Sequence, residues 1–248
     1  MLIEIIDLTL LIGIIVALAA AGMTAYAGFG GALVMVPLFT FLIDPVQAVA
    51  LTAICSSVAL VHVLPGLFTT VKWSEVVPVF IGLVVSASIA SHFLVVADVG
   101  TIRLGMGIFI LLSATVLILD FRYSGPRGHL PSLAVGALTG GIMGGFGVPA
   151  GPVMVVYYLA AKEPPAVQRA NIMLSVWLLV MVVFGNLLAR DAIETTTYLR
   201  SAFIIPASIL GAMLGKYLFR RAPVTWFKRC AHWLLIAIGV SLLVTTVT

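Results

Sequence analysis

Long apolar runs separated by short polar turns dominate the chain. Charged and turn-forming residues divide it into about ten hydrophobic segments, near residues 8–27, 31–43, 46–66, 75–96, 101–120, 131–147, 150–161, 165–189, 198–219 and 224–247. A membrane-spanning helix needs about 20 mostly apolar residues. The pattern therefore predicts an all-α integral membrane protein in which most of the segments cross the bilayer.

Two of the segments, 31–43 and 150–161, are too short to cross as straight helices. About 12 residues at 1.5 Å each reach only about 18 Å of a hydrocarbon core roughly 30 Å thick. Each short segment follows a glycine-rich break and is the second of five segments in its half of the chain. Paired short segments of this kind are typical of transporters built from inverted repeats. We expect discontinuous or re-entrant helices at both places.

The most loop-like stretch, residues 121–130, lies at the centre of the chain. Its glycine, proline and basic residues predict a cytoplasmic linker between a first membrane repeat, residues 1–120, and a second, residues 131–248. The two halves resemble each other weakly, since residues 30–50 align with residues 150–170 at a constant offset of 120. If each half crosses the membrane an odd number of times, the second repeat has the opposite orientation in the membrane to the first.

Composition agrees with a membrane protein, because 62% of the 248 residues are hydrophobic and only 9% are charged. The net charge of +4 would suggest nucleic acid as a partner of a soluble protein, but here the basic residues lie in short loops beside lipid headgroups. With the N-terminus outside, ten of the 13 lysines and arginines lie on the cytoplasmic side. The positive-inside rule then predicts that both termini face the periplasm, with membrane lipids and not nucleic acid as partners.

The glycine-rich breaks are the first candidates for a binding site. They contain Gly28, Phe29, Gly30 and Gly31 in the first half, and Gly147, Val148, Ala150 and Gly151 in the second. Glycine allows positive φ and close backbone approach, so each break can leave the N–H groups of a new helix pointing into a cavity. Those donors and the positive end of the helix dipole suit an anion. The alternative is that the glycines only allow close helix packing.

Polar side chains on the following segments add further candidates. Thr52 and Ser56 share one helix face in the first half. Polar side chains of both halves can complete a cage around a substrate, namely Thr52, Ser56, Ser57 and His62 in the first and Gln168, Arg169, Asn171, Ser175 and Trp177 in the second. Helix packing and bonding back to a carbonyl one turn earlier are the alternative for the hydroxyl groups. His62 is a candidate proton relay, or a histidine that is simply hydrogen-bonded.

Two other features are interpreted as structural. Small residues recur at four-residue spacing at Gly82, Ser86 and Ala90, and again at Gly211 and Gly215, which predicts helix faces that pack closely. Cys55 can contact a sulfur-containing substrate, but a free cysteine also behaves as a small buried hydrophobe, and we favour that interpretation.

The sequence argues against an enzyme. Its nine acidic residues all lie near segment ends, which leaves the apolar interior without an acid–base pair or a set of metal ligands. It also lacks a phosphate-binding loop for a nucleotide-driven pump. We therefore expect no cofactor, no metal and a secondary or passive transport process.

The chain resembles the TauE/SafE family of sulfite and organosulfonate transporters, also called the toluene sulfonate uptake permease family, over nearly its whole length. The residues that carry the resemblance are Gly28 to Gly31 with Pro37, Lys72 with Trp73, Gly147 to Pro152 with Tyr157, Arg169 with Ala170, and Pro206 with Gly211 and Gly215. The sequence departs from the family pattern at Val148, Pro149 and Ala150, and at Ser86 and Ala90.

The resemblance implies a carrier in the bacterial inner membrane that moves sulfite, thiosulfate, sulfoacetate or another organosulfonate, with protons as a candidate coupling ion. Taken together, the sequence predicts a secondary transporter that clasps a small anion between the two breaks and works by alternating access. A passive anion channel that uses the same helix ends is the alternative. The sequence predicts neither the direction of transport nor whether the chain forms a homo-oligomer.

Overall fold

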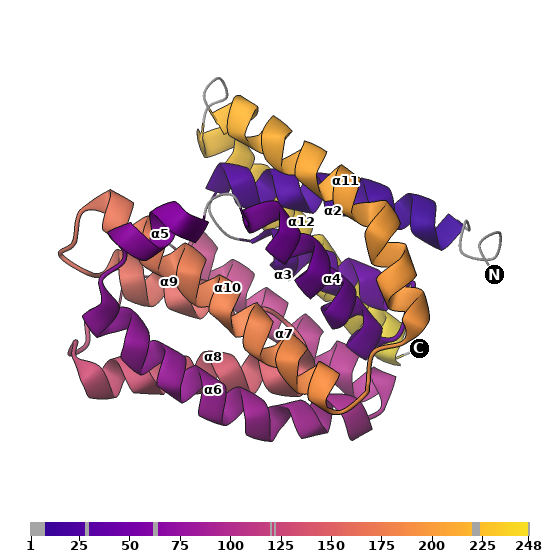
Figure 1. Cartoon of the computed structure of the whole chain (residues 1–248), viewed down its shortest axis with the longest axis horizontal. Coiled ribbons are helices and arrows are strands. Elements are labelled where there is room, and N and C mark those ends of the chain that lie inside the picture. The colour runs from indigo at the N-terminus through magenta and orange to yellow at the C-terminus, as the bar shows by residue number, and fades with distance from the viewer. Residues whose placement is uncertain are drawn as a thin grey trace.

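The chain is all-helical in the computed structural model, which describes residues 8–27, 30–61, 64–119, 121, 123–219 and 224–247. Within these ranges it forms eleven α-helices and no strand (Figure 1). The helices are α2 (Leu8–Ala27), α3 (Gly31–Thr40), α4 (Pro45–Leu60), α5 (Leu64–Thr70), α6 (Trp73–Val96), α7 (Val99–Ile118), α8 (His129–Phe146), α9 (Gly151–Leu159), α10 (Pro165–Ala189), α11 (Thr195–Phe219) and α12 (Val224–Val247).

Nine of the ten predicted segments correspond to one helix each, and the third is divided in two. Segment 46–66 forms α4, which ends at Leu60, and the start of α5, which begins at Leu64. Pro65 explains the division, because a proline inside a helix removes the hydrogen bond to the carbonyl four residues earlier, whereas the first turn of a new helix tolerates it.

Within the residues that the structure describes, five helices are long and apolar enough to cross a membrane. They are α2, α6, α7, α10 and α11, with spans at Leu8–Ala25, Trp73–Val96, Val99–Ile118, Pro165–Ala189 and Thr195–Tyr217. The prediction of a multi-pass helical membrane protein is therefore confirmed at this level.

Glycine conformations produce the two short helices. Gly30 precedes α3 with φ 99°, and Gly147 ends α8 with φ 71°, and both values lie in the left-handed region that favours glycine. α3 then has 10 residues and α9 has 9. Each rises only about 15 Å, about half the thickness of the hydrocarbon core, as the lengths of the two segments predict.

Two closely packed helix pairs form opposite edges of the molecule. α6 packs along α8, and α2 packs along α11 (Figure 1, lower and upper edges). A Cβ at Gly136 would overlap the carbonyl oxygen of Val79, and a Cβ at Gly215 would overlap that of Gly22. These contacts confirm the predicted small-residue faces, since only glycine allows the backbones so close.

The two helices of each pair run parallel. Gly211 lies against Leu18 and Gly215 against Gly22, so residue numbers rise in the same direction along α2 and α11. The same order holds for α6 and α8, which run in the opposite direction to α2 and α11 in Figure 1. The remaining helices lie between the two pairs.

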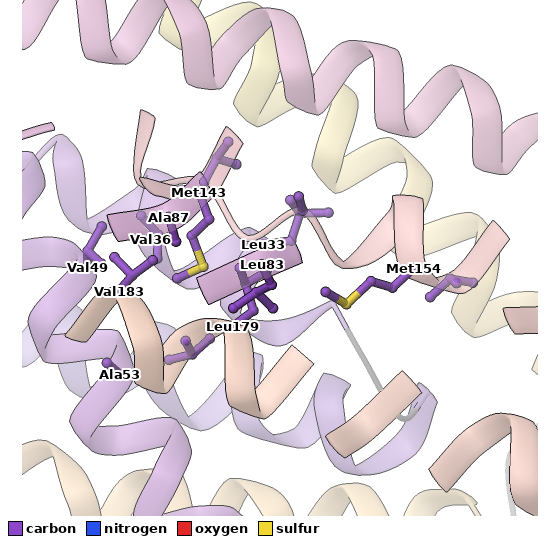
Figure 2. Packing of buried hydrophobic residues seen from close by; sticks show 14 of the residues in the cluster. Leu33, Val36, Val49, Ala53, Leu83, Ala87, Met143, Met154, Leu179 and Val183 are labelled. Atoms are coloured by element: carbon purple, nitrogen blue, oxygen red, sulfur yellow. The ribbon is translucent and has the colours of Figure 1, made fainter. Parts of the chain in front are cut away.

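The hydrophobic core joins helices from both halves of the chain. Val36 on α3, Val49 on α4, Met143 on α8 and Val183 on α10 belong to one buried cluster (Figure 2). Because helices that are far apart in sequence contribute to the same cluster, the two halves pack as one body and not as separate domains.

Amide side chains tie the helices together at both ends of the molecule. The Gln47 Oε1 on α4 accepts hydrogen bonds from the Glu194 backbone N–H (3.1 Å) and the Thr197 hydroxyl (2.7 Å) at the start of α11. The Asn171 Oδ1 on α10 accepts one from the Lys72 backbone N–H (2.9 Å) at the start of α6. Each tie therefore joins a core helix to the first turn of a helix in the other half of the chain.

Candidate functional site

A cavity of about 600 Å³ lies between helices of both halves. Its lining comes from the end of α2, the start of α3, the later part of α4, α5, the start of α10 and the later part of α11. The lining residues are Ala20, Ala21, Thr24, Ala25, Gly31, Met35, Cys55, Ser56, Leu60, Leu67, Thr70, Ala166, Arg169, Ala170, Met173, Ser208, Ala212 and Lys216. Its volume falls within the range of small-molecule sites.

The charges at the cavity are all positive. Arg169 on α10 and Lys216 on α11 both line it, and none of the described lining residues is acidic. Both side chains are exposed in the isolated chain. Two cations at one opening concentrate anions there.

Uncharged polar groups line the deeper part. The Ser208 side chain is only 2% exposed, and its hydroxyl has no oxygen or nitrogen partner in the described part of the chain, only the Cys55 thiol beside it. Cys55 is fully buried, and Ser56 follows it on α4. A thiol is only a weak hydrogen-bonding partner, so the Ser208 hydroxyl remains available to a ligand that enters the cavity.

The start of α3 reaches the cavity through Gly31. A Cβ at this position would overlap the Ala20 carbonyl oxygen and the Thr24 hydroxyl, so only glycine brings α3 this close to α2. The Gly31 N–H donates to Thr24 Oγ1 (3.1 Å), while Gly30 precedes the helix in the left-handed conformation. The positive end of the α3 dipole therefore faces the same space as Arg169.

The second glycine break does not line this cavity. Val148 and Ala150 are fully buried, and a Cβ at Gly147 would lie 2.7 Å from a methyl carbon of Val49. A Cβ at Gly151 would be 3.5 Å from a methyl carbon of Val176. The structure therefore brings Gly31 and Ser56 together at the cavity and leaves the residues of the second break in the core.

The remaining predicted residues lie outside the cavity lining or outside the described residues. Thr52 is 1% exposed and lies one turn before Ser56, and its hydroxyl has no partner among the described residues. Asn171 and Ser175 lie outside the lining, with Asn171 bound to the Lys72 N–H and Ser175 hydrogen-bonded to the Tyr158 hydroxyl (2.9 Å). Gly28, Phe29 and His62 lie outside the described residues.

Several lining residues were missed as candidates in the sequence, among them Thr24, Ser208 and Lys216. Lys216 was counted only among the basic residues on the cytoplasmic side, Cys55 was interpreted as a small hydrophobe, and Ser208 was not singled out. Lys216 could have been found, because an ionisable residue inside an apolar segment marks a functional position by default. Ser208 carries no such signal, since hydroxyl groups are common on packed membrane helices.

The described side chains provide no obvious metal site. No group of three histidine, cysteine, aspartate or glutamate residues comes together in the described part of the chain. The cavity itself offers cations, hydroxyl groups and a helix N-terminus, which are donors for an anion and not ligands for a cation.

A family model described as "Sulfite exporter TauE/SafE" matches residues 13–242, nearly the whole chain. Searches of curated proteins and of solved structures found no match. The matched range includes every described residue that lines the cavity.

Proposed function

Because the chain belongs to the TauE/SafE family of sulfite exporters, a family of membrane transporters and not of enzymes, we propose that it carries a small sulfur-containing anion through the 600 Å³ cavity. The observation that carries the proposal is the pair Arg169 and Lys216 at a cavity that also receives the start of α3. Sulfite, thiosulfate, sulfoacetate and other organosulfonates are the candidate substrates.

The donor set fits such an oxyanion physically. The negative charge is spread over several oxygens, each of which accepts hydrogen bonds, and the cavity offers hydroxyl groups at Ser56 and Ser208. The Thr24 hydroxyl also lines the cavity but donates to the Ala20 carbonyl oxygen (3.1 Å). The exposed cations attract the anion, and the neutral donors deeper in the cavity hold it without the cost of burying a fixed charge. Alanine and methionine side chains line the rest of the cavity.

The helix arrangement supports transport by two inverted repeats, residues 1–120 and 131–248, joined by a linker at 121–130. α2 packs on α11 as α8 packs on α6, so the first helix of each half pairs with the fourth main segment of the other. The same relation holds for the amide ties, because Gln47 in the first half binds the start of α11 in the second, and Asn171 in the second half binds the start of α6 in the first. Such a relation suits alternating access around a central site.

The charge distribution supports an orientation in the bacterial inner membrane with both termini in the periplasm. In that orientation Arg169 and Lys216 lie toward the cytoplasm, which agrees with the positive-inside rule. The cavity is then the cytoplasm-facing access to the substrate site, with a closed periplasmic side where Gln47 holds the start of α11.

Purified protein in liposomes tests the proposal. We expect saturable sulfite flux that is accelerated by sulfite on the opposite side, because an alternating-access carrier exchanges substrates whereas a channel does not. Imposing a pH gradient in the same assay tests whether protons drive the flux.

Charge-removing variants connect the flux to the cavity. Arg169→Gln and Lys216→Gln should each weaken sulfite binding about fivefold, since a unit charge at about 4 Å in a hydrated setting contributes about 1 kcal/mol. Lys162→Gln is the matched control, because this exposed lysine lies outside the cavity lining. Equal losses in all three variants, or the absence of flux of any small sulfur anion, would contradict the proposal.

A further inference from the structure

A second and much smaller pocket adjoins the cavity. It has a volume of about 40 Å³ and shares Thr24, Ser56, Leu60 and Met173 with the larger space. Its other lining residues are Gly30, Ala32, Val176, Trp177 and Val180. Because four residues line both spaces, the narrow pocket lies directly beside the wide cavity.

Trp177 gives this pocket an unusual donor. Its indole Nε1 is fully buried and has no acceptor among the residues that the structure describes. Met173, Val176 and Val180 share the same face of α10, so the indole lies on the side of the helix that faces the pocket. An indole N–H can only donate, and leaving a buried donor without a partner is costly. The pocket is therefore suited to a group that accepts hydrogen bonds.

The opposite side of the pocket contributes further donors. Gly30 and Ala32 flank the first residue of α3, where backbone N–H groups and the positive end of the dipole are directed out of the helix. Ser56 adds a hydroxyl from α4. Donors from three different helices thus surround one small space.

The volume limits what can enter. A cavity of about 40 Å³ is roughly three times the minimum for one water molecule, so it accommodates a few heavy atoms and not an organic tail. A pyramidal or tetrahedral oxyanion head such as sulfite has this size. The larger cavity has ample room for any organic part of the substrate.

We infer that the small pocket is the inner subsite for the oxyanion head, and that the Trp177 indole N–H is a specificity-determining donor to one of its oxygens. The inference rests on the proposed function and refines it. The substrate is drawn in by Arg169 and Lys216 and then seats its head between Trp177 and the start of α3.

Tryptophan fluorescence tests the subsite directly. A Trp73→Phe/Trp226→Phe/Trp233→Phe variant keeps Trp177 as its one tryptophan. Adding sulfite to this variant in detergent should shift the emission with the same saturation as binding to the wild-type protein. Trp177 itself is intact here, so the result does not depend on how the pocket tolerates a substitution.

Substitution tests the donor itself. Trp177→Phe should weaken sulfite binding by about tenfold, because a hydrogen bond to a charged acceptor is lost while an aromatic ring remains. Trp177→His should recover part of the affinity, since imidazole can donate through a ring N–H. Trp233→Phe is the matched control, because Trp233 is 72% exposed. This variant should bind sulfite as the wild-type protein does.

The outcomes separate this inference from the proposed function. If the wild-type protein binds and transports sulfite but Trp177→Phe binds it equally well and Trp177 emission does not respond, the subsite is wrong while the transporter stands. If the wild-type protein neither binds nor moves a sulfur oxyanion, both are wrong. Loss of affinity in Trp177→Phe, recovery in Trp177→His and a Trp177 emission change together support the subsite.

Discussion

Polar atoms without partners mark the proposed substrate path at the residue scale. Ser208 lines the wide cavity and Trp177 lines the narrow pocket, and each buries a hydrogen-bonding atom that has no oxygen or nitrogen partner in the described part of the chain. Most other buried hydroxyl groups bond within the protein, as Thr40 and Ser201 do to backbone carbonyls. Thr52 and Asn171 also bury polar atoms without a partner among the described residues, but they lie outside both linings. Ser208 and Trp177 differ from them in bordering an open space.

Asp98 provides a pH-dependent test of the fold at a single residue. Its carboxylate caps α7 by accepting hydrogen bonds from the Thr101 backbone N–H (2.8 Å) and hydroxyl (2.6 Å). The bonds from Thr101 lower the pKa of Asp98 below its ordinary value of 3.8. The stabilisation is thus complete above pH 3.8 and is lost as the pH falls through the lowered pKa of the folded state.

Asp98→Ala should accordingly lower the melting temperature at pH 7, and the difference from the wild type should close as the pH falls well below 3.8. Asp98→Asn is the control, because asparagine also caps helices but does not titrate in this range. Thermal unfolding of the three proteins across pH gives the answer. A gap that stays constant to the lowest pH would exclude the capping carboxylate as its cause.

The sequence predicted part of the candidate site at this scale. Gly31 and Ser56 were identified because a glycine break and a hydroxyl at helical spacing leave a pattern, and both line the cavity. The second break was expected beside them, but Gly147 packs against Val49 in the core. The two breaks have similar sequences, and only the packing of neighbouring side chains decides which one borders an open space.

At the element scale, the helices follow the hydrophobic pattern closely. The bounds of α10 and α12 coincide with the predicted segments, because charged residues and prolines limit where an apolar helix can begin and end. The pairing of the helices was harder to predict from the sequence. Small-residue spacing on α6 and α11 predicted close faces, but the partners α8 and α2 follow from three-dimensional packing alone.

Two glycines on α8 test the close pairing with α6. A Cβ at Gly136 would overlap the Val79 carbonyl oxygen, whereas a Cβ at Gly141 meets no atom within 4 Å. Gly136→Ala should destabilise the protein by about 1 to 3 kcal/mol, because a backbone atom cannot move aside without separating the helices. Gly141→Ala should be neutral or stabilising by up to about 1 kcal/mol, from helix propensity.

Thermal unfolding in one detergent compares the two variants under the same conditions. Both exchange glycine for alanine on one helix, so they differ mainly in the proximity of α6. Similar melting temperatures for Gly136→Ala and Gly141→Ala would show that the α6–α8 contact is looser than the structure describes.

At the scale of the whole molecule, the two amide ties place related constraints at opposite ends. Gln47 holds the start of α11 through Glu194 and Thr197, and Asn171 holds the start of α6 through Lys72. The end at Asn171 has an additional ion pair between Lys72 and Glu163 (2.6 Å). Alternating access requires each end to open in turn, so these ties are the contacts that such a movement would have to break.

The proposed inverted repeats predict which loops share a side of the membrane. The central linker and the turn between α10 and α11 should lie on opposite sides, cytoplasmic and periplasmic respectively, because α8 to α10 contribute an odd number of crossings in the proposed repeat. Ser124 in the linker and Thr196 at the start of α11 are both exposed and suit labelling. Single cysteines at these positions, with Cys55 and Cys230 replaced by alanine, show on which side of the membrane each loop lies.

A membrane-impermeant maleimide added to intact cells should label Thr196→Cys and leave Ser124→Cys unmodified until the membrane is permeabilised. The cysteine-free variant is the control for background labelling, and liposome flux of each variant verifies that the fold is retained. Labelling of both positions from outside would contradict the inverted repeats, since it requires an even number of crossings between them. Labelling of Ser124→Cys alone would reverse the orientation, and the cavity bordered by Arg169 and Lys216 would then face the periplasm.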